Sequence, residues 1–128
     1  MTAPVESRGY VHGDVLVSTD WVADHLGDPA VRVIESNEDM LLYPSGHIPG
    51  AVYVDLDRQL ARHHSAATEG RHPLPEVAEL QAAARSWGIH QGDTVVVYDD
   101  LKNLSSARAW WLLRHAGIED VRVLDGSL

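Results

Sequence analysis

The chain has 128 residues, a length that suits one ordinary domain. Hydrophobic residues make up 45% of it and charged residues 23%, so the composition is that of a globular protein and not of a disordered or fibrous one. Ten basic residues against nineteen acidic ones give a formal net charge of −9. This balance argues against a protein that coats nucleic acid, because such surfaces need a basic face.

Apolar runs are short throughout the sequence. The run Val95–Tyr98 has four residues, whereas roughly 20 are needed to cross a bilayer. The first residues also lack the apolar core of a signal peptide. We therefore expect a cytoplasmic protein with no membrane and no nucleic-acid partner. Residues 1–13 are predicted to be a flexible polar tail, and residues 14–128 one domain.

The sequence contains no cysteine. This excludes disulfides, thiolate metal sites, iron–sulfur clusters and every mechanism that uses a cysteine nucleophile.

The first half of the domain alternates short apolar runs with one helical stretch. Val15–Val17 is a short strand candidate, and Ser18 or Thr19 is placed to cap a helix that continues to Leu26. Two more strands are predicted, at Val31–Ile34 and at Ala51–Leu56. Residues 57–75 have the composition of a loop.

The second half repeats this alternation. A helix is predicted from Pro75 to Trp87, and Gly88 should end it. Thr94–Tyr98 is the strongest strand and continuous enough to be buried on both faces. The remaining predicted elements are a helix capped by Ser105 or Ser106 that runs to Gly117, and a final strand at Val121–Leu124.

Strands that alternate with helices predict an α/β domain, a mostly parallel sheet with helices on both faces. In such sheets, ligands bind in the crevice outside the carboxyl ends of the strands. Those ends are predicted at Glu35, at Leu56 and Asp57, and at Asp99 and Asp100.

Four motifs resemble one family. Gly46–Ala51 (GHIPGA) resembles the first signature of the rhodanese (thiosulfate sulfurtransferase) family, and Val121–Gly126 (VRVLDG) resembles the second. Arg71–Pro75 and Ala107–Trp111 are similar to the N-terminal half of the two-domain thiosulfate and 3-mercaptopyruvate sulfurtransferases. The resemblance covers about residues 14–128 and implies a rhodanese-like fold with a five-stranded sheet.

The chain departs from the family at Asp99. In active rhodanese domains a cysteine follows the central strand and carries a persulfide, whereas here Asp99 follows Tyr98. An aspartate cannot take up a sulfane sulfur, so no catalytic residue is expected in this chain. The resemblance implies that a second domain supplies the cysteine. It also implies a closing helix beyond Gly126, which this sequence does not contain.

Three residues are candidates for substrate binding through the resemblance. Arg108 matches an arginine that reaches an anionic substrate across the domain cleft, and its forked donors suit thiosulfate or a carboxylate. Asp57 and His72 match the acid and the histidine of a serine-linked proton relay. The alternatives are a surface arginine or a partner of Asp99 or Asp100, a turn-capping aspartate and an exposed loop histidine.

Other histidines are not expected to bind metal. His47 is interpreted as structural within its turn, and His63 and His64 as solvated loop residues without a third ligand. No metal ion and no cofactor are expected.

Two functions remain open. The first is the non-catalytic domain of a sulfurtransferase that moves sulfane sulfur from thiosulfate or 3-mercaptopyruvate to a thiophilic acceptor. The second is a stand-alone rhodanese-like pseudoenzyme that acts as a binding or regulatory module. In either case we expect contact with a C-terminal rhodanese domain or self-association, with Trp110 or Trp111 at the contact. We also expect that Asp99→Cys alone does not create an efficient enzyme, because the loop is not arranged to present N–H donors to a thiolate.

Overall fold

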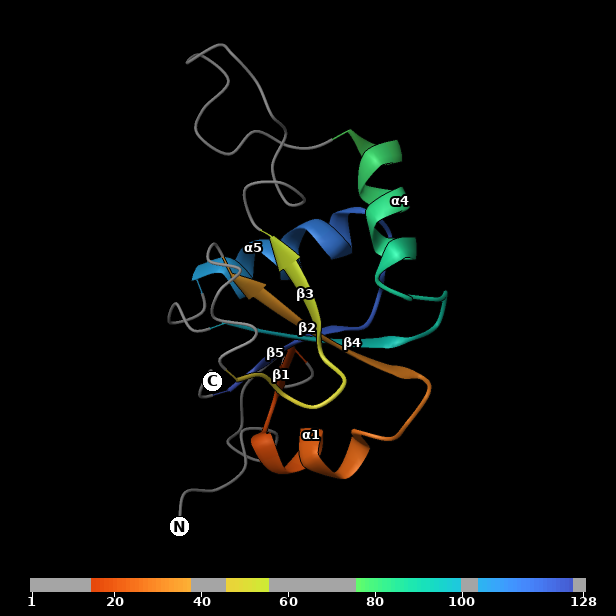
Figure 1. Ribbon diagram of the computed structural model, residues 1–128. Helices are drawn as coiled ribbons and strands as arrows, with labels where there is room; N and C mark the ends of the chain where they lie inside the picture. The colour runs from red at the N-terminus through yellow and green to blue at the C-terminus, as the bar shows by residue number, and fades with distance from the viewer. Residues whose placement is uncertain (1–14, 38–45, 56–75, 100–103, 126–128) are drawn as a thin grey trace.

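A computed structural model describes residues 15–37, 46–55, 76–99 and 104–125 (Figure 1). The predicted tail at residues 1–13 lies outside these ranges. The described strands form one sheet in the order β1-β5-β4-β2-β3, and every neighbouring pair is parallel. The strands are β1 (Leu16–Val17), β2 (Val31–Asn37), β3 (Val52–Asp55), β4 (Thr94–Tyr98) and β5 (Val121–Leu124). The helices are α1 (Thr19–His25), α4 (Val77–Ser86) and α5 (Leu104–His115).

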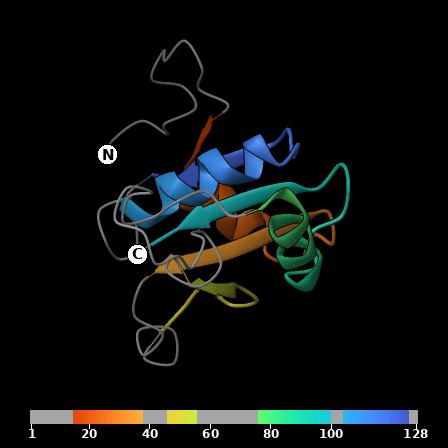
Figure 2. The ribbon, with the colours of Figure 1, turned by 90° about the horizontal axis from the view of Figure 1, so that it is seen from above.

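The helices cover both faces of the sheet, as predicted. Helices α4 and α5 lie on one face and α1 on the other (Figure 1), and Figure 2 shows α4 and α5 lying over the strands. None of the described helices is both long and apolar enough to cross a membrane.

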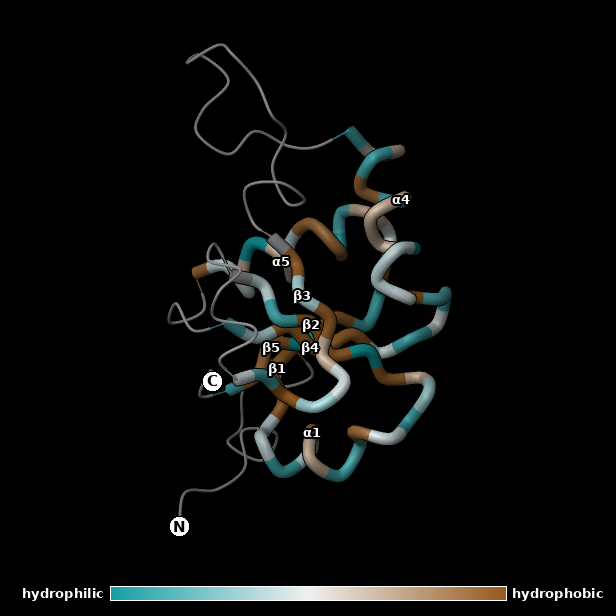
Figure 3. The backbone as a smooth tube through the Cα atoms, in the orientation of Figure 1, coloured by the Kyte–Doolittle hydropathy of each residue, from teal (hydrophilic) through white to brown (hydrophobic). Residues whose placement is uncertain are grey.

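Strand β4 is the centre of the core, and its side chains alternate between the two layers. Val95 and Val97 pack in the cluster that includes α4 and α5, whereas Val96 and Tyr98 pack in the cluster that includes α1. All four side chains are fully buried. The prediction of a strand buried on both faces is therefore confirmed, and the most hydrophobic stretches of the chain run through the sheet in Figure 3.

The ends of α1 and α4 follow from local chemistry. Ser18 caps α1, because its Oγ accepts a hydrogen bond from the backbone N–H of Trp21 at 3.1 Å. Gly88 ends α4 as predicted, with a φ of 78° that few residues other than glycine adopt. Its carbonyl accepts a hydrogen bond of 3.3 Å from Arg32.

Among the boundaries that differ from the sequence prediction, those of β2 and α5 concern polar residues. Strand β2 continues past Ile34 to Asn37, because β3 pairs with it from Ile34 to Asn37, and β4 pairs with it as far as Glu35. Helix α5 begins at Leu104, so Ser105 and Ser106 lie inside its first turn and do not cap it. The side chain that accepts hydrogen bonds from this turn is Asp99, described below.

Candidate functional site

The carboxyl ends of β2 and β4 lie side by side at one edge of the sheet. The register pairs Glu35 with Tyr98, and Ser36 and Asp99 are the residues that follow them in the chain. The side chains of all four are fully buried. This is the edge at which ligands of parallel α/β sheets bind.

Asp99 is bound to the start of α5. Its Oδ2 accepts hydrogen bonds from the backbone N–H groups of Ser105 at 2.9 Å and Ser106 at 2.7 Å. The first N–H groups of a helix have no partner inside the helix, and its positive end favours an anion. The Asp99 carboxylate therefore occupies the position that a bound anion or a thiolate would take at this helix end.

A pair of buried hydroxyl groups joins β2 to the same turn of α5. The Oγ atoms of Ser36 and Ser105 are 2.7 Å apart, and the Ser36 hydroxyl also lies 3.2 Å from the Ser105 carbonyl oxygen, to which it can donate. The first turn of α5 is thus held by side chains from both β2 and the end of β4. These contacts fix the position of the helix relative to the sheet.

On the α1 side of the sheet, Tyr98 connects β2 to the turn of the GHIPGA motif. Its hydroxyl donates to Glu35 Oε1 at 3.0 Å and accepts from the backbone N–H of Ile48 at 3.0 Å. The other carboxyl oxygen of Glu35, Oε2, is buried and has no hydrogen-bond partner among the residues that the structure describes. His47, in the same turn, is exposed.

Arg108 lies in the second turn of α5, beyond Ser105 and Ser106, whose N–H groups donate to Asp99. Its guanidinium carbon is 5.9 Å from the centroid of the Trp111 ring, within the range of a cation–π contact. Partial burial lowers the pKa of Arg108 from its usual value, but a guanidinium remains a cation at neutral pH. It is suited chemically to binding a small anion with two parallel hydrogen bonds.

The structure describes two of the residues singled out from the sequence, Asp99 and Arg108. Asp99 is bound to the first turn of α5, and Arg108 lies in the second turn of the same helix. Asp57 and His72, the other two substrate-binding candidates, lie outside the described residues, as do His63 and His64. The buried pair formed by Glu35 and Tyr98 was not identified as a pair from the sequence. The available signal was that Glu35 directly follows one predicted strand and Tyr98 ends another. The carboxyl ends of neighbouring parallel strands lie at the same edge of a sheet.

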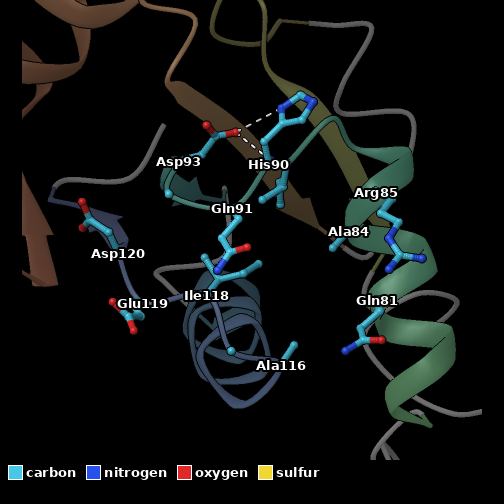
Figure 4. Close-up of a pocket in the computed structure, with 13 residues that line it drawn as sticks. Gln81, Ala84, Arg85, His90, Gln91, Asp93, Ala116, Ile118, Glu119 and Asp120 are labelled. Atoms are coloured by element: carbon cyan, nitrogen blue, oxygen red, sulfur yellow. Dashed lines mark hydrogen bonds and ion pairs between the residues drawn. The ribbon is translucent and has the colours of Figure 1, made fainter.

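A hollow lies at the opposite edge of the sheet, near the amino ends of β4 and β5. It has a volume of about 640 Å³ and lies between the ends of α4 and α5 (Figure 4). Among the residues that line it, the backbone N–H of His90 donates to Asp93 Oδ2 at 2.8 Å. This hydrogen bond stabilises the turn that contains both residues. We place the candidate site at the carboxyl edge, because Asp99 and Arg108 lie beside that edge and do not line the hollow.

Comparisons with known proteins agree with the fold. A family model for the rhodanese-like domain matches residues 18–128. SseB of Mycobacterium tuberculosis is 44% identical over 123 residues, and the sulfur carrier protein TtuD of Thermus thermophilus is 43% identical over 119 residues. These matches cover 91% and 93% of this chain, but 43% and 40% of the two relatives.

A solved structure shows the same arrangement. The crystal structure of the 3-mercaptopyruvate sulfurtransferase SseA from Escherichia coli superposes with a TM-score of 0.76 at 35% identity, covering 89% of this chain and 45% of that one. The five-stranded parallel sheet is thus the one expected from the resemblance. The chain spans less than half the length of these relatives.

Proposed function

Because this chain belongs to the rhodanese-like domain family and has no cysteine, we propose that it is the non-catalytic domain of a cytoplasmic sulfurtransferase. The enzyme would move sulfane sulfur from thiosulfate or 3-mercaptopyruvate to a thiophilic acceptor. The observation that carries the proposal is the buried Asp99 carboxylate at the end of the central strand, which accepts hydrogen bonds from the N–H groups of Ser105 and Ser106. A family cysteine would stand there.

The Asp99 carboxylate stabilises the start of α5 but cannot perform the reaction of a thiolate. A thiolate can attack the transferable sulfur of the donor and hold it as a persulfide, while the S–S bond of thiosulfate breaks to release sulfite or the C–S bond of 3-mercaptopyruvate breaks to release the enolate of pyruvate. A carboxylate forms no stable bond to that sulfur. A second rhodanese-like domain must therefore supply the cysteine. In this proposal the present chain forms one wall of a shared cleft.

Arg108 is the proposed contribution of the described residues to that cleft. Thiosulfate and 3-mercaptopyruvate are both small anions, and a partly buried guanidinium binds such oxygens in a fixed orientation. We propose that Asp57 and His72 also face the substrate.

A chimera of the E. coli 3-mercaptopyruvate sulfurtransferase tests the proposal. This chain is 37% identical to that enzyme over 121 residues, and it would replace the matched segment while the rest of the enzyme supplies the cysteine. We expect the chimera to release pyruvate from 3-mercaptopyruvate, and Arg108→Ala to raise its KM by about tenfold or more, as the loss of a charge-assisted hydrogen bond implies. Arg85→Ala, which removes an exposed arginine of α4, is the matched control.

A folded chimera without activity would contradict the proposal and favour a stand-alone binding or regulatory module. The gene provides an independent test. A reading frame that continues from this chain into a strand followed by cysteine supports a catalytic second domain, and a gene coding for no more than these residues supports the stand-alone module.

A further inference from the structure

Helix α5 carries an unusual outer face. Three large hydrophobic side chains are exposed among the described residues, and two of them, Leu104 at 66% and Trp111 at 46%, lie on this helix. They are seven residues apart, which places them on the same side of the helix. Arg114 and His115 are also exposed on α5. We call Leu104, Ala107, Trp111, Arg114 and His115 the α5 outer face.

We infer that the α5 outer face is the docking surface for a second rhodanese-like domain of the same polypeptide, with Trp111 as its central contact. This inference rests on the proposed function, in which such a domain supplies the cysteine. The partner surface would present a hollow for the indole ring with carboxylates around it. The contact would also bring the second domain against Arg108, whose guanidinium lies over Trp111.

The indole of Trp111 is already held in place. The ring of His115 stacks on it with a centroid distance of 5.6 Å and an interplanar angle of 4°, and Arg108 contacts it as well. A side chain that is ordered before binding loses less conformational entropy when a partner covers it. Tryptophan and arginine are the residues that most often dominate binding energy at the centre of an interface.

The charge of this face indicates the chemistry of the partner surface. Residues 104–115 contain two arginines and a histidine but no acidic residue, in a chain with a net charge of −9. An exposed basic face on an acidic domain is complementary to carboxylates on a partner.

Two observations argue against a second copy of this chain as the occupant. A symmetric contact between two α5 outer faces would bring their arginines together, which repels. A helix of 12 residues offers a face of roughly 18 by 10 Å, well below the roughly 800 Å² per partner of a stable complex. A domain joined by a linker needs less area, because the linker raises its effective concentration.

The chimera with the E. coli enzyme tests the docking surface through Trp111 itself. The fluorescence of Trp111 is obtained as the difference between the protein and its Trp111→Phe variant, and its quenching by acrylamide is measured in the isolated chain and in the chimera. We expect Trp111 to be quenched readily in the isolated chain and several-fold less in the chimera, since docking excludes solvent.

A matched pair of leucine variants provides the second measurement. Leu104→Ser alters the α5 outer face, whereas Leu26→Ser alters an exposed leucine just after α1 on the other side of the sheet. We expect Leu104→Ser to speed proteolysis of the linker in the chimera by about tenfold, as for loss of an interface contact, and Leu26→Ser to leave the rate unchanged. Equal rates would overturn the inference.

The outcomes separate the docking surface from the proposed function. An active chimera in which Trp111 stays as accessible as in the isolated chain overturns the docking surface alone. An inactive but folded chimera in which Trp111 is protected supports the surface and contradicts the function. Sedimentation of the isolated chain gives a result even where a chimera fails to fold. A monomer with accessible Trp111 is expected, and a dimer that protects Trp111 overturns the inference in favour of a second copy.

Discussion

The Tyr98 hydroxyl donates a hydrogen bond to Glu35 Oε1 at 3.0 Å, inside a part of the protein where both side chains are fully buried. The same hydroxyl accepts the backbone N–H of Ile48. One oxygen atom therefore joins β2, β4 and the turn of the GHIPGA motif. The strict register between Glu35 and Tyr98 makes this contact possible.

We predict that Tyr98→Phe destabilises the fold by about 2–4 kcal/mol, because it removes the partner of the buried Glu35 carboxyl oxygen and of the partly buried N–H of Ile48. Urea unfolding followed by circular dichroism measures the change. Glu35→Gln is the comparison variant, since its amide oxygen can still accept from Tyr98, and it should cost less. A loss of stability below about 0.5 kcal/mol in Tyr98→Phe would show that water replaces the hydroxyl.

Asp99→Ala should also destabilise the protein. It removes the acceptor of two buried N–H groups at the start of α5, and we expect a loss of about 2–4 kcal/mol in unfolding free energy. Asp99→Asn keeps one acceptor oxygen and should lose less. If the Ala and Asn variants are equally stable to urea, the acceptor oxygen that Asn keeps adds no stability. The hydrogen bonds from Ser105 and Ser106 would then not be what stabilises the fold at this position.

The isolated chain should form no thiocyanate from thiosulfate and cyanide, because it has no thiol to carry the persulfide. The measurement is thiocyanate release with purified protein. A heat-unfolded sample serves as the control for contaminants and for the uncatalysed reaction. A rate that rises in proportion to the folded protein would contradict the prediction.

The structure changes one expectation about Asp99→Cys. From the sequence, the loop was not expected to present N–H donors at this position, but the N–H groups of Ser105 and Ser106 both point at Asp99. That reason is therefore wrong. We now predict that the thiol of this variant has a pKa below the free value of about 8.5, because these donors and the helix end stabilise a thiolate.

Titration of the thiol by its ultraviolet absorbance tests this prediction. Ala82→Cys places a thiol on the exposed side of α4 and is the matched control. Equal thiol pKa values in the two variants would mean that the N–H groups no longer reach the smaller side chain. A lowered pKa does not by itself predict efficient sulfur transfer, since the proposed function also requires Arg108 and the rest of a shared cleft.

The sequence predicted those parts of the fold in which local and tertiary preferences agree. Thr94–Tyr98 and Val121–Leu124 have the predicted bounds, because runs of β-branched residues both favour strands and fill the core. The end of β2 was missed, since nothing local in Glu35 and Ser36 favours a strand. Pairing decides their conformation: Glu35 pairs with both β3 and β4, and Ser36 pairs with β3.

The candidate site was predictable only where a family motif marks it. Asp99 and Arg108 were identified by their positions relative to the central strand and the helix after it. The hydrogen bonds from Ser105 and Ser106 to Asp99 depend on where α5 starts, which sequence boundaries do not fix. That Asp57 and His72 take part in substrate binding stays a prediction.

The last prediction concerns Asp120, at the opposite edge of the sheet. Burial raises the pKa of this carboxyl group, but hydrogen bonds from Arg122 and Thr94 and the charge of Arg122 outweigh it, so the pKa of Asp120 is lowered overall. The distances are 2.9 Å from Arg122 Nε to Oδ1 and 2.8 Å from Thr94 Oγ1 to Oδ2. A carboxyl pKa that is lower in the folded state stabilises the fold above the unfolded pKa, and this contribution disappears as the pH falls through the folded value.

Asp120→Asn should therefore destabilise the protein at pH 7 by less than about 1 kcal/mol, since the side chain is 41% exposed and solvent screens the pair. As the pH falls through the lowered pKa of Asp120, the wild-type carboxyl is protonated as well, and the difference in stability should shrink. Urea unfolding at pH 7 and at a series of lower pH values measures it. Glu119→Gln removes the same charge from the neighbouring exposed residue and corrects for the general effect of the net charge of −9. An equal loss at every pH would show that the geometry of the hydrogen bonds, and not the charge of Asp120, stabilises this edge of the sheet.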